Sequence, residues 1–135
     1  MNVRTAIAED LAAIAEIQAL SPEASQWDPE SYLNYDCTVA IETRVIGFLV
    51  ARETAQGERE ILNLAVDPGK RRRGVARALL QAELAREKTQ WFLEVRASNR
   101  SALELYESAG FRVTGRRESY YSNPIEPGIV MQFDS

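Results

Sequence analysis

A strand-length apolar run, a basic loop containing glycine and an amphipathic helix follow one another over residues 61–84. The run 61–66 ends at the turn signal Asp67-Pro68 and predicts a largely buried strand. The helix is indicated by two apolar rows: Val75, Leu79 and Ala82, then Ala76, Leu80 and Leu84. Because the first N–H groups of a helix lack internal acceptors and carry the positive end of its dipole, this junction suits a phosphate or pyrophosphate. Gly74 has no side chain to keep such a ligand from the backbone.

The rest of the chain alternates strand and helix patterns. We expect a strand at 2–5, helices at about 9–20 and 29–34, a hairpin of 38–42 and 45–52, continuation of the helix above to about 88, a strand at 91–96, a helix from Asn99 to Gly110, and long antiparallel strands at 111–121 and 129–133, linked by 122–124 and 127–128. This order predicts an α/β sandwich with a mixed sheet and helices on both faces, in a single domain over 1–135.

Charge and residue usage exclude several classes of function. The net charge is -4, so the basic residues 70–73 stand out in an acidic chain and favour a small anionic ligand over a nucleic acid. There is no histidine and one cysteine, Cys37, which excludes Ser-His and Cys-His triads, an internal disulfide and a multi-cysteine zinc site. The start shows no secretory signal and no run reaches membrane-spanning length, so we expect a cytoplasmic protein without a membrane partner.

Glu94 lies in the middle of the apolar strand 91–96. Burying a carboxylate costs free energy unless it is solvated, paired or used, and desolvation raises its pKa toward the range of a general base. Glu94 is therefore either a general base or the ion-pair partner of Arg96 or of a neighbouring strand. Similarly, Tyr106 is either a functional group or a core aromatic, and Asn99 either a ligand contact or a plain helix N-cap. We expect substrate contacts near Trp27 and Tyr32, both predicted to be exposed.

The basic loop and three later segments together carry a family resemblance. Residues 71–76 (RRRGVA) fit the pattern R/Q-x-x-G-x-G/A, and they are followed by 93–99 (LEVRASN), 102–111 (ALELYESAGF) and 116–121 (RRESYY). Over residues 61–121 the chain resembles the GNAT superfamily of N-acetyltransferases and, within it, the RimI-type ribosomal-protein alanine acetyltransferases.

The resemblance implies the GNAT fold, in which the mixed sheet splays open between its two central parallel strands and holds acetyl-CoA there. It implies backbone hydrogen bonds from β-strand residues 64–66 to the pantetheine arm, and N–H groups of residues 72–77 around the pyrophosphate. The cofactor-binding set is then Leu64, Ala65, Val66, Arg71, Arg72, Arg73, Gly74, Val75, Ala76, Arg77 and Asn99. Glu94 matches the family's general base and Tyr106 its general acid, and no metal is implied.

These residues lead to an acetyl-CoA-dependent transfer to the α-amine of a protein N-terminus, with the N-terminal alanine of a small-subunit ribosomal protein as one candidate acceptor. The alternative acceptor is a small amine such as a polyamine, an amino acid or an aminoglycoside. A non-catalytic acyl-CoA sensor and a nucleic-acid-binding patch at residues 70–73 are further alternatives. Tyr120 and Tyr121 favour a peptide, because they could form aromatic walls for its backbone.

Overall fold

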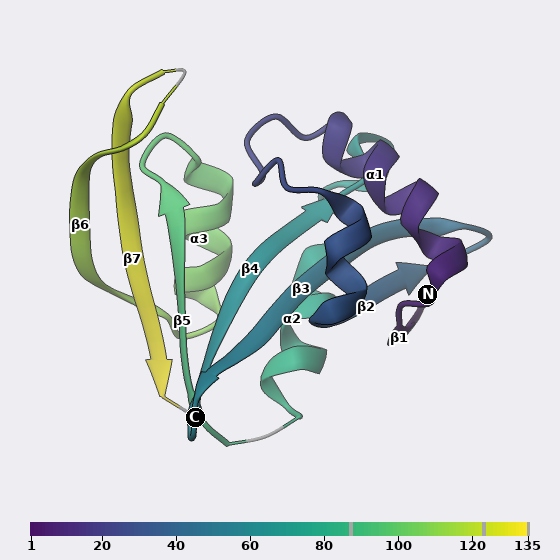
Figure 1. Cartoon of the computed structure of the whole chain (residues 1–135), viewed down its shortest axis with the longest axis horizontal. Coiled ribbons are helices and arrows are strands. Elements are labelled where there is room, and N and C mark those ends of the chain that lie inside the picture. Colours follow the sequence, from purple (N-terminus) through teal and green to yellow (C-terminus); the bar gives the residue numbers. More distant parts are fainter. Residues whose placement is uncertain (87, 123, 135) are drawn as a thin grey trace. The chain divides into compact units, whose positions relative to one another are not determined.

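The computed structural model describes residues 1–86, 88–122 and 124–134, and within them it contains a seven-stranded mixed sheet of order β1-β2-β3-β4-β5-β7-β6. The strands are β1 (Asn2–Thr5), β2 (Asp36–Ile41), β3 (Val45–Ala55), β4 (Glu58–Val66), β5 (Gln90–Arg96), β6 (Arg112–Tyr121) and β7 (Glu126–Asp134). β4 and β5 run parallel, whereas β1–β2, β2–β3, β5–β7 and β6–β7 are antiparallel. The predicted mixed α/β sheet is confirmed (Figure 1).

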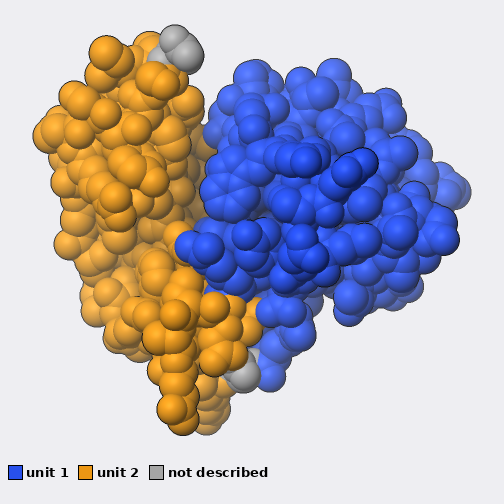
Figure 2. Space-filling view, in the orientation of Figure 1, with its two compact units in different colours: residues 1–52, 61–87 blue, residues 53–60, 88–135 orange. Residues whose placement is uncertain are grey.

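Two compact units make up the chain, residues 1–52 with 61–87 (unit 1) and residues 53–60 with 88–135 (unit 2) (Figure 2). Unit 1 holds α1 (Leu11–Ala19), α2 (Val75–Leu84) and the short 3-10 helices η1 (Ala8–Asp10), η2 (Pro29–Asn34) and η3 (Pro68–Lys70). Unit 2 holds α3 (Arg100–Ser108). Among the residues described, no helix is both long and apolar enough to cross a membrane.

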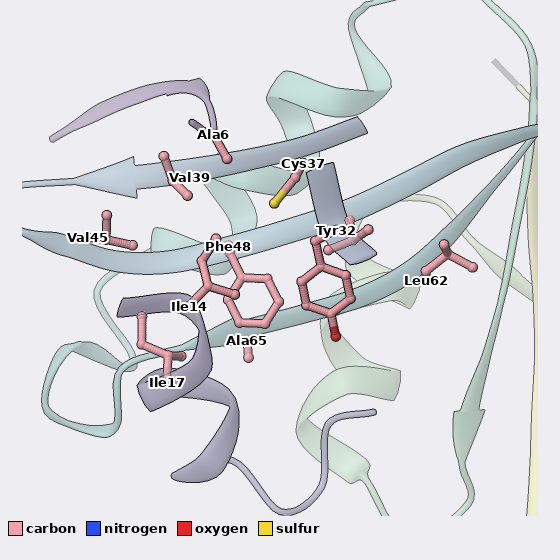
Figure 3. Packing of buried hydrophobic residues seen from close by; sticks show 11 residues of the cluster. Ala6, Ile14, Ile17, Tyr32, Cys37, Val39, Val45, Phe48, Leu62 and Ala65 are labelled. Carbon is pink, nitrogen blue, oxygen red and sulfur yellow. The ribbon is translucent and has the colours of Figure 1, made fainter. Parts of the chain in front are cut away.

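The alternation of side chains along β3 places α1 and α2 on opposite faces of unit 1. A Cβ added to Gly47 would lie 3.1 Å from Val75 and 3.2 Å from Leu79, so this position faces α2. Phe48, the next residue, belongs instead to the buried cluster that includes Ile14 of α1 (Figure 3). Because successive strand residues point to opposite sides, helices cover both faces here, as the sequence predicts.

Tyr32 belongs to this cluster, and the prediction that it is exposed is wrong. Its side chain is fully buried, its ring lies 5.8 Å from that of Phe48, and its hydroxyl points away from the apolar side chains (Figure 3). The hydroxyl donates to Gln18 Oε1 at 2.5 Å and accepts from Asn63 Nδ2 at 3.1 Å. Burial is therefore possible because both polar partners are supplied. Trp27, in contrast, is exposed as predicted.

In unit 2, α3 begins and ends where local signals predict. Asn99 Oδ1 accepts from the Ala102 N–H at 3.2 Å, which confirms Asn99 as the N-cap. Gly110 follows the helix with φ at 107°, a left-handed conformation suited to a helix end. Tyr106 then packs on Phe111, with ring centres 5.6 Å apart, and Phe111 packs on Phe133 of β7.

Several predicted boundaries are wrong. α2 ends at Leu84 rather than near Lys88, and Glu87 lies outside the described residues. The polar residues 53–59 largely extend β3 and β4 into a longer hairpin. Pro127 and Gly128, expected in a link, lie in β7, and Asn123 of the other expected link is outside the described residues. Local composition does not fix where an element ends. Strand ends in particular depend on pairing with neighbouring strands, which a single sequence does not show.

Candidate active site

The loop between β4 and α2 in unit 1 has the backbone conformation of an anion site. Asp67 is the N-cap of η3: its Oδ1 accepts from the Gly69 N–H at 2.8 Å, and its other oxygen pairs with Arg44 at 2.6 Å. Arg72 and Gly74 then have positive φ, 63° and 80°. Gly74 is followed directly by the right-handed helical residue Val75. A left-handed residue next to a right-handed one turns successive N–H groups to one side, an arrangement that binds anions.

Gly74 is the N-cap of α2 and provides no side-chain acceptor. The N–H groups of the first turn therefore keep the orphan donors that every helix start has. A Cβ added to Gly74 would meet no atom within 4 Å, so the space outside the glycine is open among the described residues. The buried side chain of Val75 anchors the helix start against Gly47. This half of the predicted site fits a pyrophosphate through backbone groups.

The basic side chains of the loop mostly contact the protein itself. Lys70 Nζ pairs with Glu42 at 3.2 Å and holds the pKa of that carboxyl below its usual range, while Arg73 lies 4.0 Å from Glu42. Arg71 donates to the Val66 carbonyl at 3.2 Å, to Ser21 Oγ at 3.0 Å and to Glu23 at 3.1 Å. Arg71 therefore ties the loop to the segment after α1. Its predicted contact with the cofactor stays a prediction.

Glu94 lies on β5 in unit 2, opposite Val130 of β7, with its side chain 14% exposed. Oε2 is buried and has no hydrogen-bond partner among the residues described. The predicted pairing with Arg96 is not observed: Arg96 pairs with Glu126 at 3.4 Å, whereas Arg117 Nε lies 3.4 Å from Glu94 Oε2. The ion-pair alternative thus holds with another partner, two strands away in the sheet order.

The pKa of Glu94 is raised from its ordinary value. Burial of the carboxylate is the main cause, Arg117 acts in the opposite direction, and the charge of Glu60 on β4 raises the pKa further. A buried oxygen without a hydrogen bond and a raised pKa is what a carboxylate that accepts a proton requires. The geometry supports the general-base interpretation and leaves the role itself a prediction.

Tyr121 of β6 interacts with both Glu94 and Tyr106 in unit 2. Tyr121 donates from its hydroxyl to the Glu94 carbonyl at 3.4 Å and interacts electrostatically with Tyr106. Burial raises the pKa of Tyr106 well above its ordinary range, and it raises the pKa of Tyr121 to about 12. Both hydroxyls therefore stay protonated at neutral pH, which is the state of a proton donor.

Sequence reasoning missed Arg117 and Gly128, which both contact the Glu94 carboxylate. A Cβ added to Gly128 would lie 2.5 Å from Glu94 Oε2 and 3.1 Å from Tyr120 Cδ2, so the carboxylate lies in the space that a side chain would fill. The only sequence signal was the segment 116–121, which carried the family resemblance without a role for Arg117.

The parallel ladder described between β4 and β5 joins Glu58, Arg59 and Glu60 to Gln90, Trp91 and Phe92. These pairs lie at the starts of both strands, short of their ends at Val66 and Arg96.

The profile of the acetyltransferase (GNAT) family matches residues 5–111. The chain belongs to the acetyltransferase (GNAT) family. It is therefore an N-acetyltransferase, and the predicted GNAT fold is confirmed.

Named relatives of this N-acetyltransferase share its sequence over most of their length. The [ribosomal protein bS18]-alanine N-acetyltransferase of Escherichia coli K12 is 40% identical over 109 residues, which cover 76% of this chain and 71% of that protein. Its counterpart from Salmonella typhimurium is 38% identical over 108 residues, with the same coverage. The resemblance to RimI-type enzymes is thus confirmed.

Solved structures agree with this assignment. The crystal structure of the ribosomal-protein-S18-alanine N-acetyltransferase from Escherichia coli has a TM-score of 0.83 at 28% identity, covering 98% of this chain and 92% of that one. The Ard1 structure from Thermoplasma volcanium has a TM-score of 0.87 at 26% identity, covering 98% and 96%.

Proposed function

We propose that this N-acetyltransferase transfers the acetyl group of acetyl-CoA to the α-amine of a protein N-terminus. The observation that carries the proposal is the 40% identity to the [ribosomal protein bS18]-alanine N-acetyltransferase of Escherichia coli K12. An N-terminal alanine of a ribosomal protein in the cytoplasm is accordingly the acceptor we expect, with neither a nucleic acid nor a membrane as partner.

Residues of the β4–α2 loop are proposed to hold acetyl-CoA. The left-handed backbone at Arg72 and Gly74 and the uncapped first turn of α2 fit a pyrophosphate, which accepts hydrogen bonds and carries negative charge. Because Lys70, Arg71 and Arg73 contact protein carboxylates, we expect backbone N–H groups to be the main ligands. Ala65 and Val66 would bind the pantetheine arm, whereas the Leu64 N–H already donates to Asn63 Oδ1 at 3.0 Å.

The proposed reaction needs three proton transfers: from the acceptor's ammonium group, to the departing sulfur, and from the nitrogen once it has bonded to carbon. Glu94, directly or through a water, takes a proton from the acceptor's ammonium group, whose pKa of about 8 makes that proton weakly held. The freed amine nitrogen bonds to the acetyl carbonyl carbon as the bond from that carbon to sulfur breaks. Tyr106 gives its proton to the departing sulfur, and the nitrogen loses its second proton through solvent to the Tyr106 phenolate, which restores the hydroxyl. Backbone N–H groups near Val66 polarise the carbonyl. Direct transfer uses no enzyme nucleophile, in keeping with Cys37, whose burial raises the pKa of its thiol to about 12.

Release of CoA, followed with a thiol reagent, tests the proposal. The purified chain and acetyl-CoA are mixed with peptides that differ in their first residue, with the same peptides blocked at the N-terminus, and with a panel of small amines. We expect turnover with free Ala- or Ser-starting peptides and none with blocked ones. Turnover with small amines alone would assign the alternative acceptor class, and tight CoA binding without turnover would assign a sensor.

A further inference from the structure

The guanidinium of Arg117 contacts two groups of unit 2 at once. Its Nε lies 3.4 Å from Glu94 Oε2, and its Cζ lies 4.8 Å from the centre of the Tyr120 ring. A cation over an aromatic face is attracted by the electrons of the ring. Although the Arg117 side chain is 61% exposed, it is thus held from two directions.

A bulge in the β6–β7 pair creates this arrangement. Arg117 pairs with Gly128 and Tyr121 with Glu126, so residues 118–120 face the single residue 127. Ser119 turns the chain with φ at 54°. The extra residues bring Tyr120 close to Gly128. The closeness is shown by the distance of 3.1 Å that would separate a Cβ added to Gly128 from Cδ2 of the Tyr120 ring. Bulges of this kind re-aim side chains next to active sites.

We propose that Arg117, held by Tyr120, is a positioning residue that orients the Glu94 carboxylate for the proposed reaction. The inference rests on the proposed function and adds to it a residue with no role in the proton transfers. The contact is an ion pair without a hydrogen bond at Oε2. Arg117 therefore stabilises the charge while the oxygen stays free to accept the proton of the acceptor's ammonium group.

Described charged and titratable groups face Glu94 from two strands. Arg117 and the Tyr121 hydroxyl come from β6, and Glu60 comes from β4. β7 contributes Val130 and Gly128, which carry no charge. Arg117 lowers the pKa of Glu94, whereas burial and Glu60 raise it. Removal of Arg117 should therefore leave Glu94 protonated over a wider range of pH.

The test compares Arg117→Gln with Arg116→Gln. Arg116 is a matched control because it is 55% exposed, lies on the same strand and pairs with Glu118 instead of Glu94. The pH dependence of kcat/KM is measured for both variants, and the Glu94 carboxyl is titrated by carbon-13 NMR in the free protein. Arg117→Lys, which keeps the charge without the planar group, serves if Arg117→Gln unfolds.

On the acid side of the profile we expect kcat/KM of Arg117→Gln to fall about threefold below wild type, the size of effect typical of an exposed ion pair. At high pH kcat/KM should stay below wild type by a smaller factor, because Glu94 is then charged but lacks the contact that orients it. The NMR titration of Glu94 should shift upward. We expect Arg117→Lys to lie between the two, with wild-type behaviour for Arg116→Gln. The inference would be overturned if the Glu94 titration of Arg117→Gln coincided with that of wild type. It would also be overturned if Arg117→Gln and Arg116→Gln shifted the Glu94 titration equally. Wild-type turnover in Glu94→Gln would contradict the proposed base instead, while the NMR titration still tests the pair.

Discussion

Buried polar side chains of unit 1 are hydrogen-bonded to one another, whereas a buried carboxylate oxygen of unit 2 is not. In unit 1, Gln18, Tyr32 and Asn63 satisfy one another: Tyr32 donates to Gln18, Asn63 donates to the Tyr32 hydroxyl, and Asn63 also reaches the Ser25 carbonyl at 2.9 Å. The same network bonds Gln18 Nε2 to the Trp27 carbonyl at 2.5 Å. It fixes the segment after α1 to β4. A fully satisfied network of this kind rigidifies and specifies a core.

In unit 2, the buried Oε2 of Glu94 has no hydrogen-bond partner among the described residues, and its nearest cation is in ion-pair contact only. The indole N–H of Trp91, on the same strand, also has none there, but an indole does not titrate in this range. Buried polar groups normally have a hydrogen-bond partner, so a buried carboxylate oxygen that has only an ion-pair contact calls for an explanation. We therefore expect the hydrogen-bonded groups of unit 1 to maintain the fold, and the Glu94 carboxylate of unit 2 to take part in catalysis.

Removal of that carboxylate should have the largest effect. We expect Glu94→Gln to lower kcat about a thousandfold, within the usual contribution of a general base, with acetyl-CoA affinity by calorimetry unchanged. Because the pKa of Glu94 is raised and the base works deprotonated, wild-type activity should fall as pH decreases through that pKa. The matched variant Glu107→Gln removes an exposed carboxylate of α3 and should behave as wild type.

Two buried tyrosines, one in each unit, distinguish an effect on catalysis from an effect on stability. Tyr106→Phe should lower kcat about a hundredfold, less than Glu94→Gln because a thiolate is a good leaving group even without an acid. Tyr32→Phe should leave kcat unchanged and lower the free energy of unfolding by about 1–3 kcal/mol, because Gln18 and Asn63 both lose a buried hydrogen-bond partner. Steady-state rates and urea unfolding of both variants provide the check. A Tyr32→Phe variant with the catalytic defect of Tyr106→Phe would contradict the division between the units.

Loss of a network member in unit 1 should affect stability. Asn63→Leu leaves the Ser25 carbonyl and the Leu64 N–H without their Asn63 partner and breaks its bond to Tyr32. We expect the free energy of unfolding to fall by about 1–3 kcal/mol, since unpaired buried groups keep their full desolvation cost. Urea unfolding measures the loss. A stability equal to wild type would show that the network is not what holds this segment.

The smallest expected effect concerns the β4–α2 loop. There the proposed acetyl-CoA site is indicated by backbone conformation and not by a buried side chain. Gly74→Ala places a Cβ in open space but in a left-handed conformation, which costs about 1 kcal/mol outside glycine. We expect the Kd for acetyl-CoA to rise about fivefold by calorimetry. Gly69→Ala, in the same loop without positive φ, is the control, and an equal Kd for both variants would remove Gly74 from the proposed site.

The sequence predicted best those elements that local signals define. Asp28 caps η2 through its bond from the Glu30 N–H, and Asn99 and Gly110 bound α3, because caps depend on residues within one turn. It failed for Tyr32, whose direction depends on partners 14 and 31 residues away. Arg117 and Gly128 were missed for the same reason. Their contact with Glu94 depends on how β6 and β7, which are distant from Glu94 in the sequence, pair in the sheet.

The nitrogen that receives the acetyl group distinguishes transfer to a protein N-terminus from transfer to a side chain. A peptide that begins with alanine and contains an internal lysine is incubated with acetyl-CoA and the wild-type chain, then sequenced by tandem mass spectrometry. We expect acetyl on the α-nitrogen of the alanine, with about a thousandfold less at an equal early time in a parallel reaction with Glu94→Gln. Acetyl on the lysine side chain, or equal incorporation with Glu94→Gln, would contradict it.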